Sequence, residues 1–333
     1  MSTPRARRAG AAVVAGAVAV LVASGMASPA SAARHPLAVT GFQGSWNAPA
    51  DIDHSRHALT TVGVDGVTIA SSGASVEKPG PPQTRQLTRA HHDHLRAELL
   101  VSNFSDRIED FSEPVAHALL GHRAHVRAVA AALAADVRRQ GWDGISVDLE
   151  SLRSRDRAGL TAFVRRLRAD LPARASLSIC VMAFTRPGDY ARAGYDLSAI
   201  ARSVGRVVLM TYDQHGPWEN TPGPVGALTW QRASLAAARR FVPARQVDLG
   251  VAEYGYAWRP HSNDQLSVRK ARRLAGSRAR WDAKVGEWTA SLADGSTLWW
   301  SDARSYRARV ALARSKGLHG VAVWDLALGD PIR

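Results

Sequence analysis

Along this chain, stretches whose apolar residues recur at every second position alternate with stretches whose apolar residues recur at helical spacing. In residues 141–150, GWDGISVDLE, apolar and polar side chains alternate one by one, which is the period of a β-strand. Apolar residues recur at helical spacing before this stretch, from Val126 to Val137, and again after it, from Leu160 to Leu167. A strand with a helix on either side predicts a parallel sheet with helical crossovers.

The same exchange of strand-like and helix-like stretches extends over most of the chain. Strand-like runs occupy residues 38–46, 62–70, 98–104, 141–150, 176–184, 207–212, 247–251 and 321–324. Further helical stretches lie at residues 87–97, 231–241 and 303–315, and Ser, Gly and Pro residues predict a loop at 71–82. Eight strands with interposed helices predict the α/β class, in the form of a (β/α)8 TIM barrel.

Residues 254–302 break this rhythm, because the segment is too long for a simple crossover. It predicts a small α+β insertion between strands seven and eight that walls one side of a cleft. Its aromatic residues invite two interpretations, sugar platforms or core packing of the insertion itself. The tryptophans concerned are Trp258, Trp281, Trp288, Trp299 and Trp300.

The first 32 residues have the layout of a secretory signal peptide. Three arginines precede a small-residue apolar run from Ala9 to Ala27, and residues 30–32 form an A-x-A cleavage site. The alternatives are an uncleaved membrane anchor and, for the export route, a twin-arginine signal at Arg7-Arg8. We therefore expect a secreted or cell-wall-associated barrel at residues 33–333, with no membrane attachment after cleavage.

Composition narrows the classes of partner. The single cysteine, Cys180, lies in an apolar run, so disulfides cannot staple the fold. Removing residues 1–32 takes away three arginines and no acids, which lowers the formal charge from +14 to +11. No nucleic-acid-binding motif accompanies this charge, so no nucleic-acid partner is expected. Attraction to anionic wall polymers and a merely soluble basic surface both remain open.

Asp148 and Glu150 are the first candidates for chemistry. Because side chains two apart on a strand leave on the same face, both carboxylates are expected to point the same way. A carboxylate pair at the carboxyl end of a barrel strand suits acid-catalysed bond cleavage. The competing interpretation is a solvated edge strand, and the flanking helices weigh against it.

The cluster His91-His92-Asp93-His94 raises the question of a metal site. Neighbours at these spacings on a helix cannot all face one ion, and no further ligand set stands out. We interpret it as a surface cluster and expect no metal or other cofactor.

Three ordered motifs resemble glycoside hydrolase family 18, the chitinase-like barrels. DGISVDLE at residues 143–150 is similar to the family signature D-x-x-D-x-D-x-E, and MTYD at 210–213 and Trp324 in GVAVWDL resemble the motifs of strands six and eight. Longer stretches, among them LGVAEYGYAW and KGLHGVAVW, resemble the bacterial cell-wall and spore-germination branch, which acts on peptidoglycan. The resemblance covers essentially the whole mature chain.

This resemblance implies a role for each motif residue. Glu150 would protonate the glycosidic oxygen and then activate water. Asp148 would hold the substrate's 2-acetamido group, whose own carbonyl oxygen attacks the anomeric carbon, and Tyr212 would bond that carbonyl. Asp213 would support sugar binding and Trp324 would lie under the distorted sugar. Such a retaining mechanism uses a substrate nucleophile and needs no metal.

Four more residues are candidates for substrate binding. Asp143, Ser146 and Met210 lie within the motifs, and Glu253 ends the seventh strand, where relatives tend to have a small hydroxyl residue. Ser146 departs from the signature, because the family has there an aspartate that shares a proton with the residue at position 148. For Glu253, substrate contact and pairing with an arginine are both open.

Taken together, these residues predict a secreted, monomeric retaining glycosidase. Its polysaccharide substrate would be peptidoglycan or a chitin-type glycan, cleaved at β-1,4 bonds next to N-acetylglucosamine. The alternatives are a non-catalytic, lectin-like carbohydrate-binding barrel and a wall protein that merely keeps the fold, because fold alone does not settle function.

Overall fold

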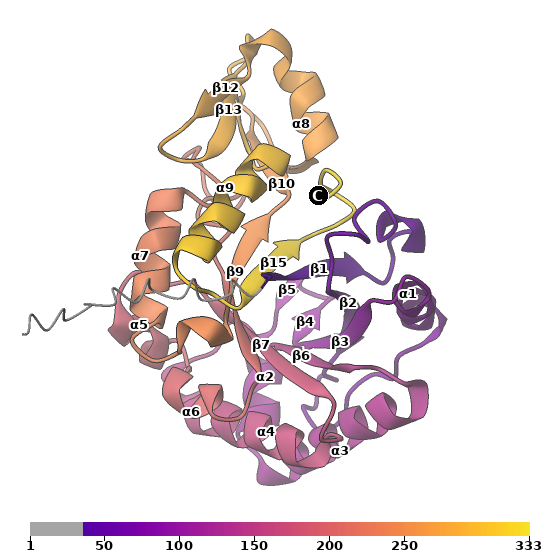
Figure 1. Ribbon diagram of the computed structural model, residues 1–333. Coiled ribbons are helices and arrows are strands. Elements are labelled where there is room, and N and C mark those ends of the chain that lie inside the picture. Colours follow the sequence, from indigo (N-terminus) through magenta and orange to yellow (C-terminus); the bar gives the residue numbers. More distant parts are fainter. Residues whose placement is uncertain (1–35) are drawn as a thin grey trace, which may run out of the picture. The chain divides into compact units, whose positions relative to one another are not determined.

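A computed structural model describes residues 36–333, of which Leu37–Arg333 form one compact unit (Figure 1). The predicted signal peptide lies outside the described residues. Within residues 36–333, no helix combines the length and apolarity that crossing a bilayer requires.

Eight parallel strands close into a barrel, which confirms the predicted TIM-barrel architecture (Figure 1). The strands are, in barrel order, β1 (Ala38–Gly44), β15 (Gly320–Trp324), β9 (Val247–Ala252), β8 (Arg206–Met210), β7 (Ser176–Met182), β6 (Gly144–Asp148), β3 (Arg96–Ser102) and β2 (Thr61–Thr68). Because all eight run the same way, their last residues meet at one end of the barrel.

Helices lie around the barrel, and they include three that the pattern did not predict, at residues 113–120, 187–192 and 197–201, and one whose boundary was misplaced. They are α1 (Pro81–His92), α2 (Glu113–Leu120), α3 (Arg123–Gln140), α4 (Arg157–Asp170), α5 (Pro187–Arg192), α6 (Leu197–Ala201), α7 (Leu228–Ala238) and α9 (Ala303–Ser315). The helix expected at 87–97 begins earlier, at Pro81, and ends at His92. Proline suits a helix's first turn, and His94 has a left-handed φ of 59°, which ends the turn before β3.

Four short 3-10 helices join these elements: η1 (Pro49–Asp51), η2 (Ser154–Asp156), η3 (Ala244–Gln246) and η4 (Gly276–Arg278). A small hairpin that the pattern did not predict, β4 (Phe104–Ser105) with β5 (Asp110–Phe111), follows β3. The rings of Phe104 and Phe111 pack edge to face across it, with centroids 5.6 Å apart.

The segment between β9 and α9 forms a second, antiparallel sheet with its own helix. Its elements are β10 (Tyr254–Trp258), β11 (Asn263–Ser267), α8 (Val268–Ala275), β12 (Arg280–Asp282), β13 (Glu287–Ser291) and β14 (Thr297–Trp300). A separate apolar core, which includes Leu266, Leu298 and Trp300, holds it together. Glu287 joins it to the barrel, because its carboxylate accepts hydrogen bonds from the amides of residues 225 and 226 and pairs with buried Arg309 at 3.1 Å.

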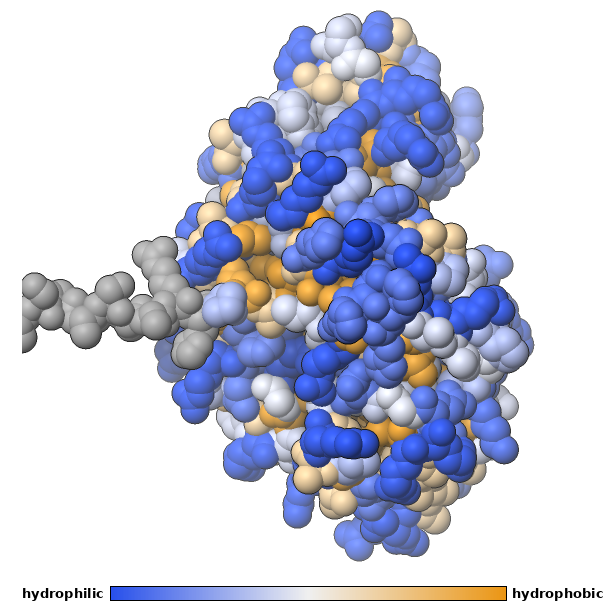
Figure 2. Space-filling view, turned by 45° about the vertical axis from the view of Figure 1, so that its right-hand side comes forward, coloured by the Kyte–Doolittle hydropathy of each residue, from blue (hydrophilic) through white to orange (hydrophobic). Residues whose placement is uncertain are grey.

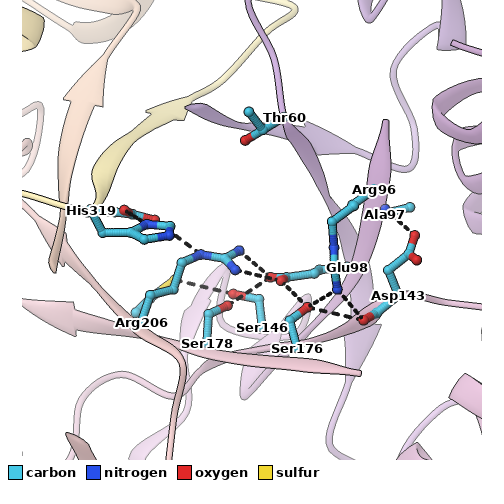
Figure 3. Close-up of polar contacts among 12 residues, drawn as sticks. Thr60, Arg96, Ala97, Glu98, Asp143, Ser146, Ser176, Ser178, Arg206 and His319 are labelled. Carbon is cyan, nitrogen blue, oxygen red and sulfur yellow. Dashed lines mark hydrogen bonds and ion pairs between the residues drawn. The ribbon is translucent and has the colours of Figure 1, made fainter. Parts of the chain in front are cut away.

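Hydrophilic residues cover most of the molecular face shown in Figure 2, with hydrophobic residues gathered in hollows between them. A different arrangement holds inside the barrel, toward the amino ends of the strands, where charged groups are buried (Figure 3). The guanidinium of Arg206 donates to both carboxylate oxygens of Glu98, at 2.7 and 2.5 Å. Its Nε lies 3.1 Å from Asp248, and His319 Nδ1 lies 2.6 Å from the other oxygen of Asp248.

Pairing governs the ionisation of this group. Burial alone would raise the pKa of Glu98, but the charge and hydrogen bonds of Arg206 and donation from Ser176 and Ser178 hold that pKa below its usual value. Glu98, Asp248 and Arg206 are all buried, so Arg206 is the counter-charge on which both carboxylates depend.

Replacing Arg206 should therefore lower the stability of the folded protein. Arg206→Met leaves the buried carboxylate of Glu98 without its counter-charge and that of Asp248 with His319 alone, and we expect it to lower the free energy of unfolding by about 3–5 kcal/mol. Arg166→Met is the control, since Arg166 pairs with Asp170 on the exposed side of α4 and such pairs contribute about 0–1 kcal/mol. Urea unfolding of both variants measures the difference, and equal losses would contradict a role for the buried pairing.

Candidate active site

A cleft of about 580 Å³ opens at the carboxyl ends of the barrel strands. Several of the residues that line it are the last residues of strands, such as Ser102 of β3, Asp148 of β6 and Met210 of β8. The full lining comprises Ser45, Trp46, Asp65, Gly66, Thr68, Glu77, Ser102, Phe104, Asp106, Phe111, Asp148, Glu150, Met210, Tyr212, Asp213 and Trp324. Six carboxylates and no lysine, arginine or histidine belong to this set.

Glu150 is held in the cleft through its backbone. Asn103, buried just after β3, accepts a hydrogen bond from the Glu150 amide at 2.9 Å and donates to the Glu150 carbonyl at 3.0 Å. Burial raises the pKa of the Glu150 carboxyl well above its usual value, and the nearby charges of Asp148, Asp213 and Asp110 raise it further. Both influences favour the protonated carboxyl that a general acid needs.

Asp148 lies deeper than Glu150. Its residue is 8% exposed, and its Oδ1 is buried without a hydrogen-bond partner among the described residues. Burial, and then the charge of Asp65, raise the pKa of the Asp148 carboxyl to about 7. A buried carboxyl without a partner is a group held ready for a ligand.

Tyr212 and Asp213 come just after β8, separated from it by Thr211, and they contact a group of aromatic residues. Asp213 has a left-handed φ of 56°, a conformation that aspartate tolerates better than most residues. Its Oδ1 accepts hydrogen bonds from the hydroxyls of Tyr254, at 2.5 Å, and Tyr256, at 2.7 Å. The ring of Tyr254 also packs edge to face against Tyr212. The first strand of the antiparallel sheet thus fixes the orientation of Asp213.

Aromatic rings line the floor and rim of the cleft. Trp324, the last residue of β15, is half-buried and packs against Phe42 with ring centroids 5.8 Å apart. At the rim Trp46 is 69% exposed. Trp218, which is not among the lining residues, is 64% exposed and packs against Tyr256. Exposed rings beside a cleft can stack on sugar faces.

Six of the nine residues proposed from the sequence lie in this cleft. They are Met210, Asp148, Glu150, Tyr212, Asp213 and Trp324. The other three, Asp143, Ser146 and Glu253, lie elsewhere. None of the five tryptophans in residues 254–302 lines the cleft, and Trp258 and Trp300 are buried in the core.

Asp143 is placed at the wrong end of the strand for substrate binding, so that expectation was wrong. It precedes β6, at the amino end, where its Oδ2 accepts a hydrogen bond from the Ala97 amide at 2.9 Å (Figure 3). The same oxygen lies 2.9 Å from His91 Nε2. Five residues of extended strand separate it from Asp148, a span of about 16 Å. Its contact with His91 also accounts for one member of the histidine cluster.

Ser146 and Glu253 also lie outside the cleft, which corrects their assignment as substrate-binding residues. Ser146 faces the barrel interior one step below Asp148, fully buried, with its Oγ 3.8 Å from the thiol of Cys180. Glu253 follows β9 and is 1% exposed, and its Oε2 accepts a hydrogen bond from the Asp330 amide. It neither contacts the cleft nor makes an ion pair with an arginine among residues 36–333.

Sequence reasoning missed several cleft residues. Asp65 and Gly66 were missed because a glycine within a strand-like run suggests a break in the strand. Asn103 was missed because its partner, Glu150, lies 47 residues away in the sequence. Phe104, Asp106 and Phe111 come from the small hairpin, which has no alternating pattern. Within the described chain, no three His, Cys, Asp or Glu side chains are arranged to hold a metal ion.

Comparison with known proteins places this geometry in context. The sequence profile described as "Glycosyl hydrolases family 18" matches residues 59–329. An uncharacterized glycosylase of Bacillus subtilis is 24% identical over 86% of this chain and 85% of its own. The cortical fragment-lytic enzyme of the same organism is 26% identical over 82% of this chain and 66% of its own length.

Solved structures agree with these relatives. A chitinase from Chromobacterium violaceum has a TM-score of 0.79 and 27% identity, covering 89% of this chain and 96% of that one. The spore cortex-lytic enzyme SleL of Bacillus cereus has a TM-score of 0.77 at 19% identity, over 88% of this chain and 71% of that one, and shows the likeness of fold.

The unpaired carboxyl of Asp148 should cost stability in a pH-dependent way. Its pKa is raised on folding, so the folded state loses stability as pH rises from the unfolded pKa through the folded one, and gains nothing below both. Asp148→Asn should therefore raise the free energy of unfolding by about 1–3 kcal/mol at pH 8 and by much less at pH 4. Urea unfolding at both pH values measures this.

Asp143→Asn is the matched control for that measurement. Asp143 accepts a backbone hydrogen bond and contacts His91, so its replacement should destabilise the fold at both pH values. An equal gain from Asp148→Asn at pH 4 and pH 8 would show that the effect is not one of charge.

Proposed function

The chain belongs to glycosyl hydrolase family 18, and on that premise we propose that it is a secreted, monomeric retaining glycosidase. In this proposal it cleaves β-1,4 bonds next to N-acetylglucosamine in peptidoglycan or chitin-like glycans. The observation that carries the proposal is a cleft in which Glu150, whose pKa is raised by burial, lies two residues after a buried Asp148 whose Oδ1 has no hydrogen-bond partner among residues 36–333.

Glu150 is the general acid in this mechanism. Its raised pKa keeps a proton available at neutral pH for the leaving glycosidic oxygen. Once that proton has left, the same carboxylate accepts a proton from the attacking water. Asn103 supports both steps because it clamps the Glu150 backbone and so keeps the side chain aimed into the cleft.

Asp148 orients the substrate and does not attack it. An acetamido N–H of the substrate would donate to its free Oδ1, and the hydroxyl of Tyr212 would donate to the acetamido carbonyl. The carbonyl oxygen then attacks the anomeric carbon, and retention follows from this substrate nucleophile. The ring of Trp324 supports the distorted sugar, and Trp46 offers a platform at the rim.

The cleft's charge favours a neutral sugar at its centre. Its six carboxylates have no cationic side chain among the lining residues, so a further carboxylate on the substrate would lack a partner. N-acetylglucosamine is neutral. Muramic acid, the second sugar of peptidoglycan, carries a lactyl carboxylate that is neutral only when amidated. Relatives named as chitinase and as cortical fragment-lytic enzyme are consistent with either glycan.

Glu150→Gln tests the catalytic assignment. It removes the only proton donor proposed for the leaving group, so release of reducing ends from N-acetylglucosamine oligomers should fall about 10²- to 10⁴-fold while oligomer binding persists. Glu253→Gln is the control, because that carboxylate lies outside the cleft, and it should retain activity. A wild type that binds these glycans without cleaving them would favour a lectin-like barrel and sink the proposal.

Substrate charge is tested with three glycans of matched length. Chitin oligomers should be hydrolysed about tenfold or more faster than peptidoglycan strands stripped of peptides, whose lactyl carboxylates are free. Amidation of those carboxylates should restore most of the rate. Mass analysis of the products measures all three, and equal rates on free and amidated strands would contradict the charge argument.

A further inference from the structure

The neighbourhood of Asp148 leaves one carboxylate unexplained. Asp65 lines the same cleft and comes from β2, on the other side of β3 in the barrel wall. No sequence motif pointed to it, and the mechanism above gives it no task.

An irregularity in β2 aims Asp65 into the barrel. The pairing of β2 with β3 runs through Val64 opposite Leu99 and resumes at Val67 opposite Val101, so two residues of β2 face one of β3. Such bulges redirect side chains and are common next to active sites. Gly66, the second bulged residue, has a φ of 122°, and its amide donates to Asp65 Oδ1 at 2.7 Å.

A side chain at position 66 would not fit this turn. A Cβ there would lie 2.1 Å from the hydroxyl oxygen of Ser45. The turn that carries Asp65 is therefore built around glycine, and the Gly66 amide stabilises the ionised form of the Asp65 carboxyl.

Nothing else in the lumen supplies Asp148 with a partner. Ser146, two residues earlier on β6, turns its hydroxyl toward Cys180, and Asp148 Oδ1 has no hydrogen-bond partner among residues 36–333. Asp65 and Asp148 line the same cleft, whose lining residues include no lysine, arginine or histidine, and two neighbouring carboxylates in such a site cannot both ionise at low cost.

We propose that Asp65 is a positioning residue for the reaction, whose carboxylate shares one proton with Asp148 and so takes the part that the hydroxyl of Ser146 cannot play. The inference rests on the proposed function for its consequence in catalysis, but the proton sharing itself is independent of turnover.

Two features place the charge on Asp65 and the proton on Asp148. Burial raises the pKa of Asp65 only to about 6, because the Gly66 amide opposes the shift, whereas the pKa of Asp148 lies near 7. A charged Asp65 then keeps the proton on Asp148 until the substrate's acetamido group arrives.

The other titratable groups near this pair do not replace Asp65. Cys180 of β7, Tyr195 and Tyr212 have raised pKa values, chiefly from burial, and stay neutral at neutral pH. The acids are Glu150, two residues after Asp148, Asp213, and Asp325, whose charge acts on Asp65 and which is itself influenced by Asp51. The cation that acts on this region from below is Arg206, which Glu98 and Asp248 already hold.

The first test is the pH profile of kcat/KM on N-acetylglucosamine oligomers. Asp65→Asn should move the basic limb to lower pH by about one unit, because Asp148 loses the charge that retains its proton. Asp65→Asn combined with Ser146→Asp should move it back, because a carboxylate returns beside Asp148. Glu253→Gln, which removes a buried carboxylate elsewhere, should leave the limb unchanged. An unmoved limb in Asp65→Asn would overturn the inference.

The second test needs no catalysis. A double-mutant cycle of Asp65→Asn and Asp148→Asn is measured by urea unfolding at pH 8 and pH 4. At pH 8 the two stability gains should not add, because either replacement relieves the same repulsion, and at pH 4 the coupling should vanish. Additive gains at pH 8 would overturn the proton sharing even in an active enzyme. Asp65→Ser, which keeps an oxygen for the Gly66 amide, serves if the asparagine variant does not fold.

These tests separate the two proposals. If the wild type shows no turnover but the cycle is coupled at pH 8, the proposed function fails and the shared proton stands. If turnover is present and the cycle is additive, the glycosidase assignment stands and Asp65 does not share a proton with Asp148.

Discussion

Charge inside a closed barrel must be paired or protonated, and this constraint organises the whole lumen. Toward the amino ends of the strands, Arg206 lies between Glu98 and Asp248, and the pairing is complete. Toward the carboxyl ends, Asp148 and Glu150 face a cleft whose lining residues carry no cation. Without a counter-ion, burial raises the pKa of both carboxyls and favours their protonated forms. One end of the lumen is thereby fixed, and the other is left ready to exchange a proton.

The reactive end is held together by parts of the chain that lie far apart in sequence. Asn103, after β3, clamps the backbone of Glu150, and Tyr254 and Tyr256, from the antiparallel sheet, bind the carboxylate of Asp213. All three are neutral donors or acceptors. They orient the acids without supplying a full charge that would pull the proton off Glu150, so positioning and acidity are controlled separately.

This arrangement places a destabilising site on a stable frame. Unpaired, buried carboxyl groups cost free energy that the fold must offset elsewhere, as is common where strained or uncompensated groups serve function. The offset comes from the apolar layer between strands and helices. Solvent-exposed ion pairs, such as Arg166 with Asp170, contribute little by comparison.

The sequence by itself determined the eight strands, the crossovers and the residues at the strand ends, because the period of a strand or helix is set by local backbone geometry. Parallel strands end at a common edge, so the sequence could predict that four of these residues share one cleft. They are Asp148, Glu150, Tyr212 and Trp324.

Only the tertiary structure decided how deep each side chain lies in the barrel and which residues far apart in the sequence lie close together in space. Asp143 and Ser146 belong to the same motif, yet one lies at the opposite end of β6 and the other below the cleft, because alternation gives the face of a side chain and not its depth. The place of Asp65 follows from a bulge between two strands, and its charge matters only because another carboxylate lies across the lumen without a partner. Such couplings arise between residues distant in the chain, and no local pattern records them.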